Sequence, residues 1–188
     1  MYDIFYEEGV INYKDTTVVY IYLPERTKVY DGTPLTYTAG DEAMVTCADS
    51  SVSVYVDIAA LSKTTVGTLT AAEILPYVTI TRYGSDIKGR CTVVIQEYGL
   101  NVLPKSIEVS TESITKVYDG TPLVSTKVYL GTALVEGHTL HASANGAITG
   151  VGYVQNGLDY CYILDKEGND VTENYTIKIN YGTLRITR

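Results

Sequence analysis

Alternating apolar and polar positions recur along the chain and predict strands. Val19, Ile21 and Leu23 point one way along an extended segment, while Tyr20 and Tyr22 point the other way. Other runs of β-branched and aromatic residues are separated by clusters of Gly, Asn and Asp, as in a sheet built from hairpins. These further strands are expected at residues 52–58, 77–81, 92–95, 107–111, 139–144, 160–164, 175–179 and 183–187. The pattern predicts an all-β fold.

A nine-residue repeat divides the chain. The sequence Thr-Lys-Val-Tyr-Asp-Gly-Thr-Pro-Leu of residues 27–35 recurs without a change at 115–123, 88 positions further on (27 to 115). That spacing is about the size of one small β domain. Weaker matches follow in the same order, between 77–80 and 160–163, 84–87 and 168–171, and 91–93 and 175–177. We predict two tandem homologous β-rich domains, 14–103 and 104–188, joined with almost no linker.

Only one segment has a helical pattern, and it is short. Residues 70–75 begin with Thr70, which can cap a helix, and are followed by Pro76, which cannot continue one. The corresponding part of the second half, near residues 156–158, carries no such signal. We expect at most one short helix in each domain.

Residues 1–13 carry a third trace of the repeat. Residues 2–4 and 9–11 match residues 175–177 and 182–184 at a constant offset of 173. This match indicates the trailing strand of a preceding repeat, so the chain is expected to be a slice of a longer array. The rival interpretation is that the segment is an edge strand of the first domain.

The repeated nonapeptide contains a turn motif. Asp can accept a hydrogen bond from the backbone that follows it and Gly can adopt a positive φ, so Asp-Gly predicts a tight turn. Pro removes a backbone donor, which suits a strand that begins at a sheet edge. The Tyr rings are expected to pack inward. The motif residues are Tyr30, Asp31, Gly32 and Pro34 in the first copy and Tyr118, Asp119, Gly120 and Pro122 in the second. In the alternative interpretation, the same Tyr and Asp side chains bind a sugar.

Composition and charge exclude several classes of protein. The chain of 188 residues is 45% hydrophobic and 19% charged, which is typical of a folded protein. Its formal net charge of -8 repels phosphate backbones, so we expect no nucleic-acid partner. No apolar run approaches the roughly 18 residues of a membrane-spanning helix, so we expect no membrane insertion.

Candidate reaction chemistry is sparse. His138 and His141 lie three apart in a predicted strand, so they face opposite sides of the sheet and do not form a metal pair. No stretch places a nucleophile beside a base, and the Gly residues mark turns rather than phosphate-binding helix starts. We therefore predict no enzyme, no catalytic or metal-ligating residue and no cofactor.

The acidic segment 165–170, Asp-Lys-Glu-Gly-Asn-Asp, has oxygen ligands of the kind that calcium prefers. The segment lacks the register of a calcium-binding loop, and the first half has Thr81 and Tyr83 where the first two acids stand. A hairpin turn is the preferred interpretation.

The three cysteines, Cys47, Cys91 and Cys161, have neither the spacing of a zinc site nor that of a disulfide framework. We expect mostly buried thiols that pack as small apolar side chains, and the sequence leaves open whether Cys47 and Cys91 form a disulfide.

Tyrosine is abundant, with 18 residues, and alternation does not allow all of them to face the core. Some of the following residues are therefore expected to be exposed or to lie at an interface: Tyr20, Tyr22, Tyr129, Tyr153 and Tyr162.

The second half resembles the YDG and MBG repeats of bacterial cell-surface proteins. The resemblance covers residues 104–188 and depends on four motifs: Lys-Val-Tyr-Asp-Gly-Thr-Pro-Leu, Glu-Gly-His-Thr-Leu at 136–140, Gly-Asn-Asp-Val-Thr-Glu-Asn-Tyr-Thr-Ile at 168–177, and Gly-Thr-Leu-Arg-Ile-Thr at 182–187. The first half keeps the opening motif, but it has Cys91 at a position where the family favours Tyr, and its ending at 97–100 is altered. The resemblance implies a β-grasp-like or immunoglobulin-like sheet. It also implies an extracellular location, cell-wall attached or secreted, in an adhesin stalk whose partners are neighbouring repeats and host glycan or mucin.

These observations favour a non-enzymatic spacer or stalk repeat of a bacterial surface protein. A glycan- or mucin-binding adhesin module is the alternative from a different class, and it would use exposed Tyr residues and acidic loops. An accessory domain of a secreted enzyme is a further alternative.

Overall fold

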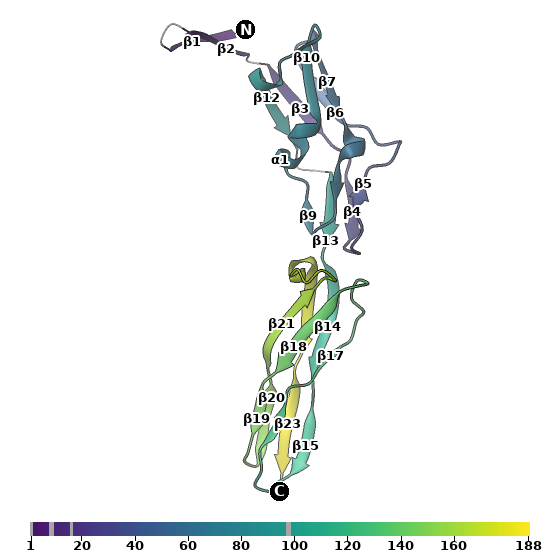
Figure 1. Cartoon of the computed structure of the whole chain (residues 1–188), viewed down its shortest axis with the longest axis vertical. Helices are drawn as coiled ribbons and strands as arrows, with labels where there is room; N and C mark the ends of the chain where they lie inside the picture. Colours follow the sequence, from purple (N-terminus) through teal and green to yellow (C-terminus); the bar gives the residue numbers. More distant parts are fainter. Residues whose placement is uncertain (1, 8–9, 16, 97–98) are drawn as a thin grey trace. The chain divides into compact units, whose positions relative to one another are not determined.

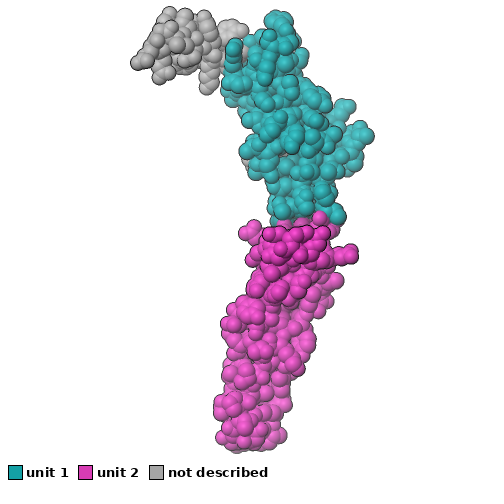
Figure 2. Space-filling view, viewed as in Figure 1, with its two compact units in different colours: residues 1–28, 33–103 teal, residues 29–32, 104–188 magenta. Residues whose placement is uncertain are grey.

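The computed structural model describes residues 2–7, 10–15, 17–96 and 99–188 (Figure 1). Most described residues are in strands, and the one α-helix among them is α1 (Ala71–Ile74), so the predicted all-β fold is confirmed. The chain forms two compact units, which Figure 2 colours separately. Unit 1 comprises residues 1–28 and 33–103, and unit 2 comprises residues 29–32 and 104–188.

Unit 1 is made of short strands in several small sheets. One sheet has the order β12-β3-β6, a second β11-β10-β7, a third β4-β13-β9, and β5 pairs with β8. The bounds are β3 (Val18–Tyr22), β4 (Arg26–Val29), β5 (Leu35–Thr36), β6 (Met44–Cys47), β7 (Val52–Val56), β8 (Ser62–Lys63), β9 (Gly67–Thr68), β10 (Val78–Arg82), β11 (Ser85–Asp86), β12 (Thr92–Ile95) and β13 (Leu100–Leu103). Short 3-10 turns are η1 (Ile58–Ala60), η2 (Leu75–Tyr77) and η3 (Lys88–Arg90).

Unit 2 has longer strands. Its sheets have the orders β17-β14-β22 and β15-β23-β20, and two further pairs are β16-β19 and β18-β21. The bounds are β14 (Lys105–Thr111), β15 (Ile114–Val117), β16 (Leu123–Ser125), β17 (Val128–Leu130), β18 (Thr139–Ala144), β19 (Gly146–Ile148), β20 (Gly152–Asn156), β21 (Leu158–Leu164), β22 (Tyr175–Asn180) and β23 (Gly182–Thr187), with one 3-10 turn, η4 (Thr172–Asn174).

The two units pair their strands in the same order. The sheet β12-β3-β6 has its counterpart in β22-β14-β17, and β4-β13-β9 has its counterpart in β15-β23-β20. The pairs β5-β8 and β10-β7 likewise correspond to β16-β19 and β21-β18. In both units the first strand runs parallel to a late one, β3 to β12 and β14 to β22. This parallel pairing departs from the antiparallel sheets of the immunoglobulin sandwich.

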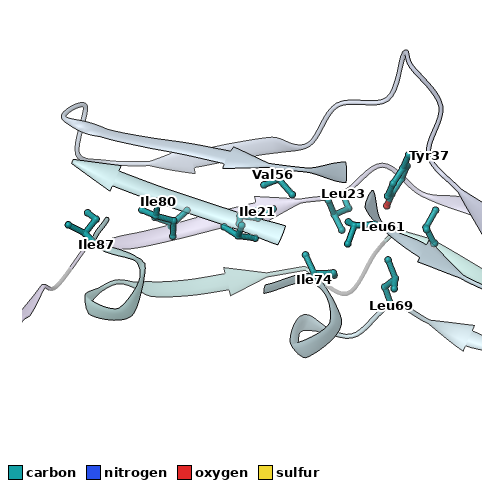
Figure 3. Packing of buried hydrophobic residues seen from close by; sticks show 12 residues of the cluster. Ile21, Leu23, Tyr37, Val56, Leu61, Leu69, Ile74, Ile80 and Ile87 are labelled. Atoms are coloured by element: carbon teal, nitrogen blue, oxygen red, sulfur yellow. The ribbon is translucent and has the colours of Figure 1, made fainter. Parts of the chain in front are cut away.

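The core of unit 1 follows from the alternation along β3. Val19, Ile21 and Leu23 are buried, whereas Tyr20 is exposed, which confirms the predicted inward face. Figure 3 shows Ile21 and Leu23 among side chains that come from β7, β10 and the turn elements. The buried cluster in this view includes Tyr37, Val56, Leu61, Leu69, Ile74, Ile80 and Ile87.

Helix α1 is the single turn that the sequence predicts. The Thr70 hydroxyl accepts a hydrogen bond from the backbone N–H of Glu73, and the Glu73 carboxylate accepts one from the Thr70 backbone N–H. This reciprocal capping box satisfies two of the free donors at the helix start. Ile74 points into the core, and Pro76 lies in η2, where the α-helix has ended.

Unit 2 is organised around an apolar cluster and a buried polar cluster. Leu123, Leu184 and Ile186 form the apolar cluster, and Ile107, Val109 and Thr111 are buried along β14, as the alternation predicts. The Thr111 hydroxyl donates to the backbone oxygen of Asn156 at 2.6 Å and accepts from the Gly182 N–H at 2.8 Å. The Asn156 side chain is also fully buried, so buried hydrogen bonds of the Thr111 hydroxyl connect β14 to β20 and β23.

Strands β1 (Tyr2–Glu7) and β2 (Val10–Asp15) pair with each other in an antiparallel, two-stranded sheet that includes no other described strand. Strands β22 and β23, which these segments match in sequence, pair instead in two different sheets. The interpretation of residues 1–13 as the tail of another repeat stays a prediction.

Candidate functional site

The two copies of the Tyr-Asp-Gly-Thr-Pro motif form the same turn. Gly32 and Gly120 both have φ of +81°, a region that favours glycine. Pro34 and Pro122 are exposed and directly precede β5 and β16, each of which belongs to a two-stranded sheet. The predicted turn and edge-strand start are therefore present in both copies.

A lysine that precedes each motif closes the turn. The Lys116 ammonium lies 2.7 Å from the Asp119 carboxylate and donates to the Thr121 carbonyl oxygen at 2.7 Å. The Asp119 carboxylate also accepts from the Thr121 N–H at 2.9 Å. The Lys116 ammonium and the Thr121 N–H hold the pKa of Asp119 well below its usual range. In the first copy, Lys28 donates to the carbonyl and hydroxyl oxygens of Thr33.

Tyr30 belongs to unit 2 and lies in an aromatic cluster there. Its ring centroid is 5.7 Å from that of Tyr175, edge to face, and 6.0 Å from that of His138. The Tyr175 hydroxyl is 2.7 Å from His138 Nδ1 and accepts from the Val135 N–H at 3.2 Å. Burial raises the pKa of the Tyr30 and Tyr175 hydroxyls. We call Val135, His138 and Tyr175 the aromatic socket.

The inward packing predicted for Tyr118 is wrong. Tyr30 is 5% exposed, as predicted, but Tyr118 is 53% exposed. The two sequences are identical over nine residues, so the difference comes from the surroundings. Tyr30 has the aromatic socket against its ring, whereas the Tyr118 turn stands at the end of β15 and contacts β23 through its N–H, which donates to the Thr187 oxygen at 2.9 Å.

The tyrosines that the alternation did not allow to share the core face are exposed, as expected for some of them, apart from Tyr22, which is partly buried. Tyr20 and Tyr153 are exposed, and Tyr129 donates its hydroxyl to the Glu112 carboxylate at 3.0 Å. The Tyr162 ring stacks on the His141 ring, with the centroids 5.1 Å apart and the ring planes at 4° to each other. The centroid of the Tyr160 ring lies 5.9 Å from that of Tyr162. We call His141, Tyr160 and Tyr162 the aromatic row. His138 lies in a different cluster, so the two histidines are separated as predicted.

The acidic segment forms a hairpin turn. The Asp165 carboxylate accepts from the N–H groups of Glu167 and Asn169 at 2.9 and 2.8 Å, and the Asp170 carboxylate accepts from the Thr172 N–H at 2.9 Å. Hydrogen bonds from the Asn169 side-chain amide and the Thr172 hydroxyl, together with these backbone N–H groups, lower the pKa of Asp165 and Asp170. Within residues 17–96 and 99–188, the structure shows no cluster of three or more His, Cys, Asp or Glu side chains that could hold a metal ion.

Cys47, Cys91 and Cys161 are not joined in disulfides, and each is partly buried. Cys47 is on β6 and Cys91 directly precedes β12, and these two strands lie on opposite sides of β3. Two strand spacings of about 4.8 Å keep them too far apart for a disulfide. The open possibility of a Cys47–Cys91 bridge is therefore wrong for this structure. Both thiols pack against the apolar core, as predicted.

Sequence reasoning did not identify the aromatic socket. Val135 and Tyr175 are 40 positions apart, and their hydrogen bond depends on the parallel pairing of β14 with β22. The available signal was the pair of motifs containing His138 and Tyr175, which the resemblance included without assigning them a contact.

Comparison with protein-family models, with curated proteins and with solved structures found no match for this chain. The described part of the chain contains no helix with the length and apolar character needed to cross a membrane.

The matched turns provide a test of how each glycine is used. A Cβ at Gly32 would lie 2.8 Å from Val135 Cγ1, whereas a Cβ at Gly120 would meet open space. Gly120→Ala should cost about 1 kcal/mol for the positive φ alone, and Gly32→Ala should cost clearly more because the socket must also shift. Chemical denaturation of the two variants measures the difference. Equal losses of unfolding free energy in the two variants would show that the Val135 side chain moves aside without cost.

Proposed function

We propose that the chain is a non-enzymatic spacer, or stalk, of a bacterial surface protein of the adhesin type. The resemblance of residues 104–188 to YDG and MBG repeats supports this assignment, as does the repeated nonapeptide. The shared strand order of the two units adds to the support for a duplicated module. We further propose an extracellular location, on the cell wall or secreted, with neighbouring repeats as partners.

Parallel pairing in unit 2 is the single observation that carries the spacer function. The chain enters the unit through β14 and leaves through β23, and Figure 1 shows these strands reaching opposite ends of the unit. β14 pairs in parallel with β22 from Lys105↔Tyr175 to Ser110↔Asn180, and β23 pairs in parallel with β15 and antiparallel with β20. A pull along the chain therefore draws each terminal strand lengthwise past its neighbours.

That geometry loads many hydrogen bonds together. Inter-strand bonds run across the strands, so lengthwise sliding of β23 strains the bonds to β15 and β20 at the same time. A pull across the strands would instead open them one by one, at about 1 kcal/mol net for each. A unit built in this way suits a chain that must resist tension between its two ends.

Force spectroscopy of the full chain tests the proposal. Handles at residues 104 and 188 load β14 and β23 lengthwise, whereas handles at residues 151 and 188 peel β20 from β23, because Gly152 pairs with Ile186. Both versions carry the same replacements of the three cysteines. We expect the lengthwise pull to need the larger force for unit 2, since forced unfolding reports the unfolding barrier. Equal forces would contradict the spacer proposal.

The glycan-binding alternative has one supporting observation, the aromatic row on β18 and β21. Sugar and other small-ligand sites combine apolar faces with polar groups that fix the ligand. The row instead lies on a two-stranded sheet, and its rings contact one another. We therefore place this function second. Oligosaccharide binding that shifts only the NMR signals of His141, Tyr160 and Tyr162 would reverse the order.

A further inference from the structure

Large apolar side chains are exposed where β15, β20 and β23 of unit 2 reach the same end. Val117 and Tyr118 follow one another at the end of β15, and Val151 and Tyr153 lie at the start of β20. Val117 pairs with Thr187 and Gly152 pairs with Ile186, so these residues flank the last part of β23. The exposed fractions are 65% for Val117, 53% for Tyr118, 51% for Val151 and 78% for Tyr153. We call these four residues the end patch.

The chain itself shows what can cover a Tyr-Asp-Gly turn. The nonapeptide that contains Tyr118 is identical to the one that contains Tyr30. Both turns have the same glycine φ, but the Tyr30 ring is buried against Tyr175 and His138. Gly32 approaches Val135 so closely that a Cβ would clash, while the space beside Gly120 is open. The Tyr118 turn thus has the shape of a docked turn without an occupant in the described residues.

We propose that the end patch is a docking surface for the aromatic socket of a second copy of unit 2. The Tyr118 ring would take the place that Tyr30 has between His138 and Tyr175, and Gly120 would contact Val135. The inference names the partner of the spacer module and so rests on the proposed function.

The partner must be a copy of unit 2, because unit 1 does not offer an equivalent socket. The Val52 N–H donates to the Asp49 oxygen as the His138 N–H donates to the Val135 oxygen, so Asp49 corresponds to Val135. The parallel registers likewise align Cys91 with Tyr175. The Asp49 carboxylate forms an ion pair with Arg82 at 2.7 Å. A charged pair and a thiol thus stand where unit 2 has an apolar side chain and a phenol.

The test uses the full chain extended by a second copy of residues 105–188 placed directly after Arg188. The added copy carries Tyr118→Phe, so that only the original Tyr118 reports. Tyrosine nitration with tetranitromethane, followed by peptide mass spectrometry, compares Tyr118 with the buried Tyr30 and with Tyr83, which is 89% exposed. In the unextended chain Tyr118 should react nearly as fast as Tyr83. In the extended chain we expect its reaction to slow at least tenfold.

A matched control separates docking from simple crowding. Val135→Asp in the added copy introduces the residue that unit 1 has at this position, and it should restore the reactivity of Tyr118. Tyr118 that stays fully reactive while the added copy is folded by hydrogen exchange would overturn the proposal. The force measurement uses the unextended chain, so a higher unfolding force for the lengthwise pull would still support the spacer function if docking fails. Failure of docking and failure of the spacer function are therefore distinguishable.

A second measurement decides the matter if the added copy does not fold. Tyr30→Ala in the unextended chain removes the ring from the socket, so the Tyr118 turn of another chain can enter. Head-to-tail contacts of this kind do not close and give open-ended association. Sedimentation equilibrium at about millimolar concentration should detect it, since untethered docking lacks the effective concentration of a linked partner. Association should vanish with Tyr118→Ala, and a monomeric Tyr30→Ala chain would overturn the proposal.

Discussion

Asn156→Ala should lower the free energy of unfolding of unit 2 by about 3 kcal/mol, because a buried and a partly buried backbone group lose their partner. The Asn156 Oδ1 accepts from the Gly146 N–H at 2.8 Å, and its Nδ2 donates to the Glu112 carbonyl oxygen at 3.0 Å. Asn156 is fully buried. A buried donor or acceptor left unpaired costs about 1–3 kcal/mol. For a unit of this size the loss corresponds to a fall in Tm of roughly 15 °C.

Calorimetry of the full chain, with hydrogen exchange to assign the transitions to units, measures this effect. Asn180→Ala is the matched control, since Asn180 is an exposed residue of β22 in the same unit. Surface substitutions of this kind usually change stability by less than about 0.5 kcal/mol. Equal effects of the two substitutions would show that water satisfies Gly146 and Glu112 once the amide is gone.

Gly182→Ala should destabilise unit 2 to a similar extent for a different reason. Gly182 begins β23, and a Cβ there would meet the backbone oxygens of Thr111 and Glu112 far inside van der Waals contact. Backbone atoms cannot rotate away as a side chain can, so β23 must separate from the end of β14. Forced overpacking typically costs 1–3 kcal/mol, and we expect about 3 kcal/mol here. The Gly182 N–H would also lose its bond to the Thr111 hydroxyl.

Gly150→Ala is the control for Gly182→Ala, and it should have the opposite sign. A Cβ at Gly150 meets nothing within 4 Å, and Gly150 does not have a positive φ in the left-handed region. Replacement of Gly by Ala at such a site stabilises by about 0.4–1 kcal/mol through the unfolded chain. Urea denaturation of both variants gives the comparison. A Gly182→Ala chain as stable as the Gly150→Ala chain would show that β23 shifts without cost.

Local sequence patterns predicted the strands and the helix well because their causes are local. The alternation of Val19, Ile21 and Leu23 with tyrosine allows only one face to be apolar, and that face is buried. Thr70 and Glu73 are three positions apart, the spacing of a capping box, and Pro76 fixes the end of the helix. The Asp-Gly turns follow in the same way from residue types that favour them.

The aromatic socket and the buried polar cluster were not predictable in the same way. Thr111 appeared in the sequence as the last position of an inward face, without a sign that its hydroxyl would link Asn156 to Gly182. His138 appeared as one of two histidines in a strand. Both groups form between residues that are 37 to 71 positions apart. Their contacts depend on strand order and register.

The sequence alone determined that this protein is all-β, that it repeats one turn motif, and that each copy of the motif has a glycine with positive φ. Those properties depend on side-chain alternation and on the backbone freedom of single residues. Only the tertiary structure decided that Tyr30 is buried and Tyr118 is exposed. Nine identical residues have the same local preferences, so the burial of a ring depends on which distant side chains pack against it.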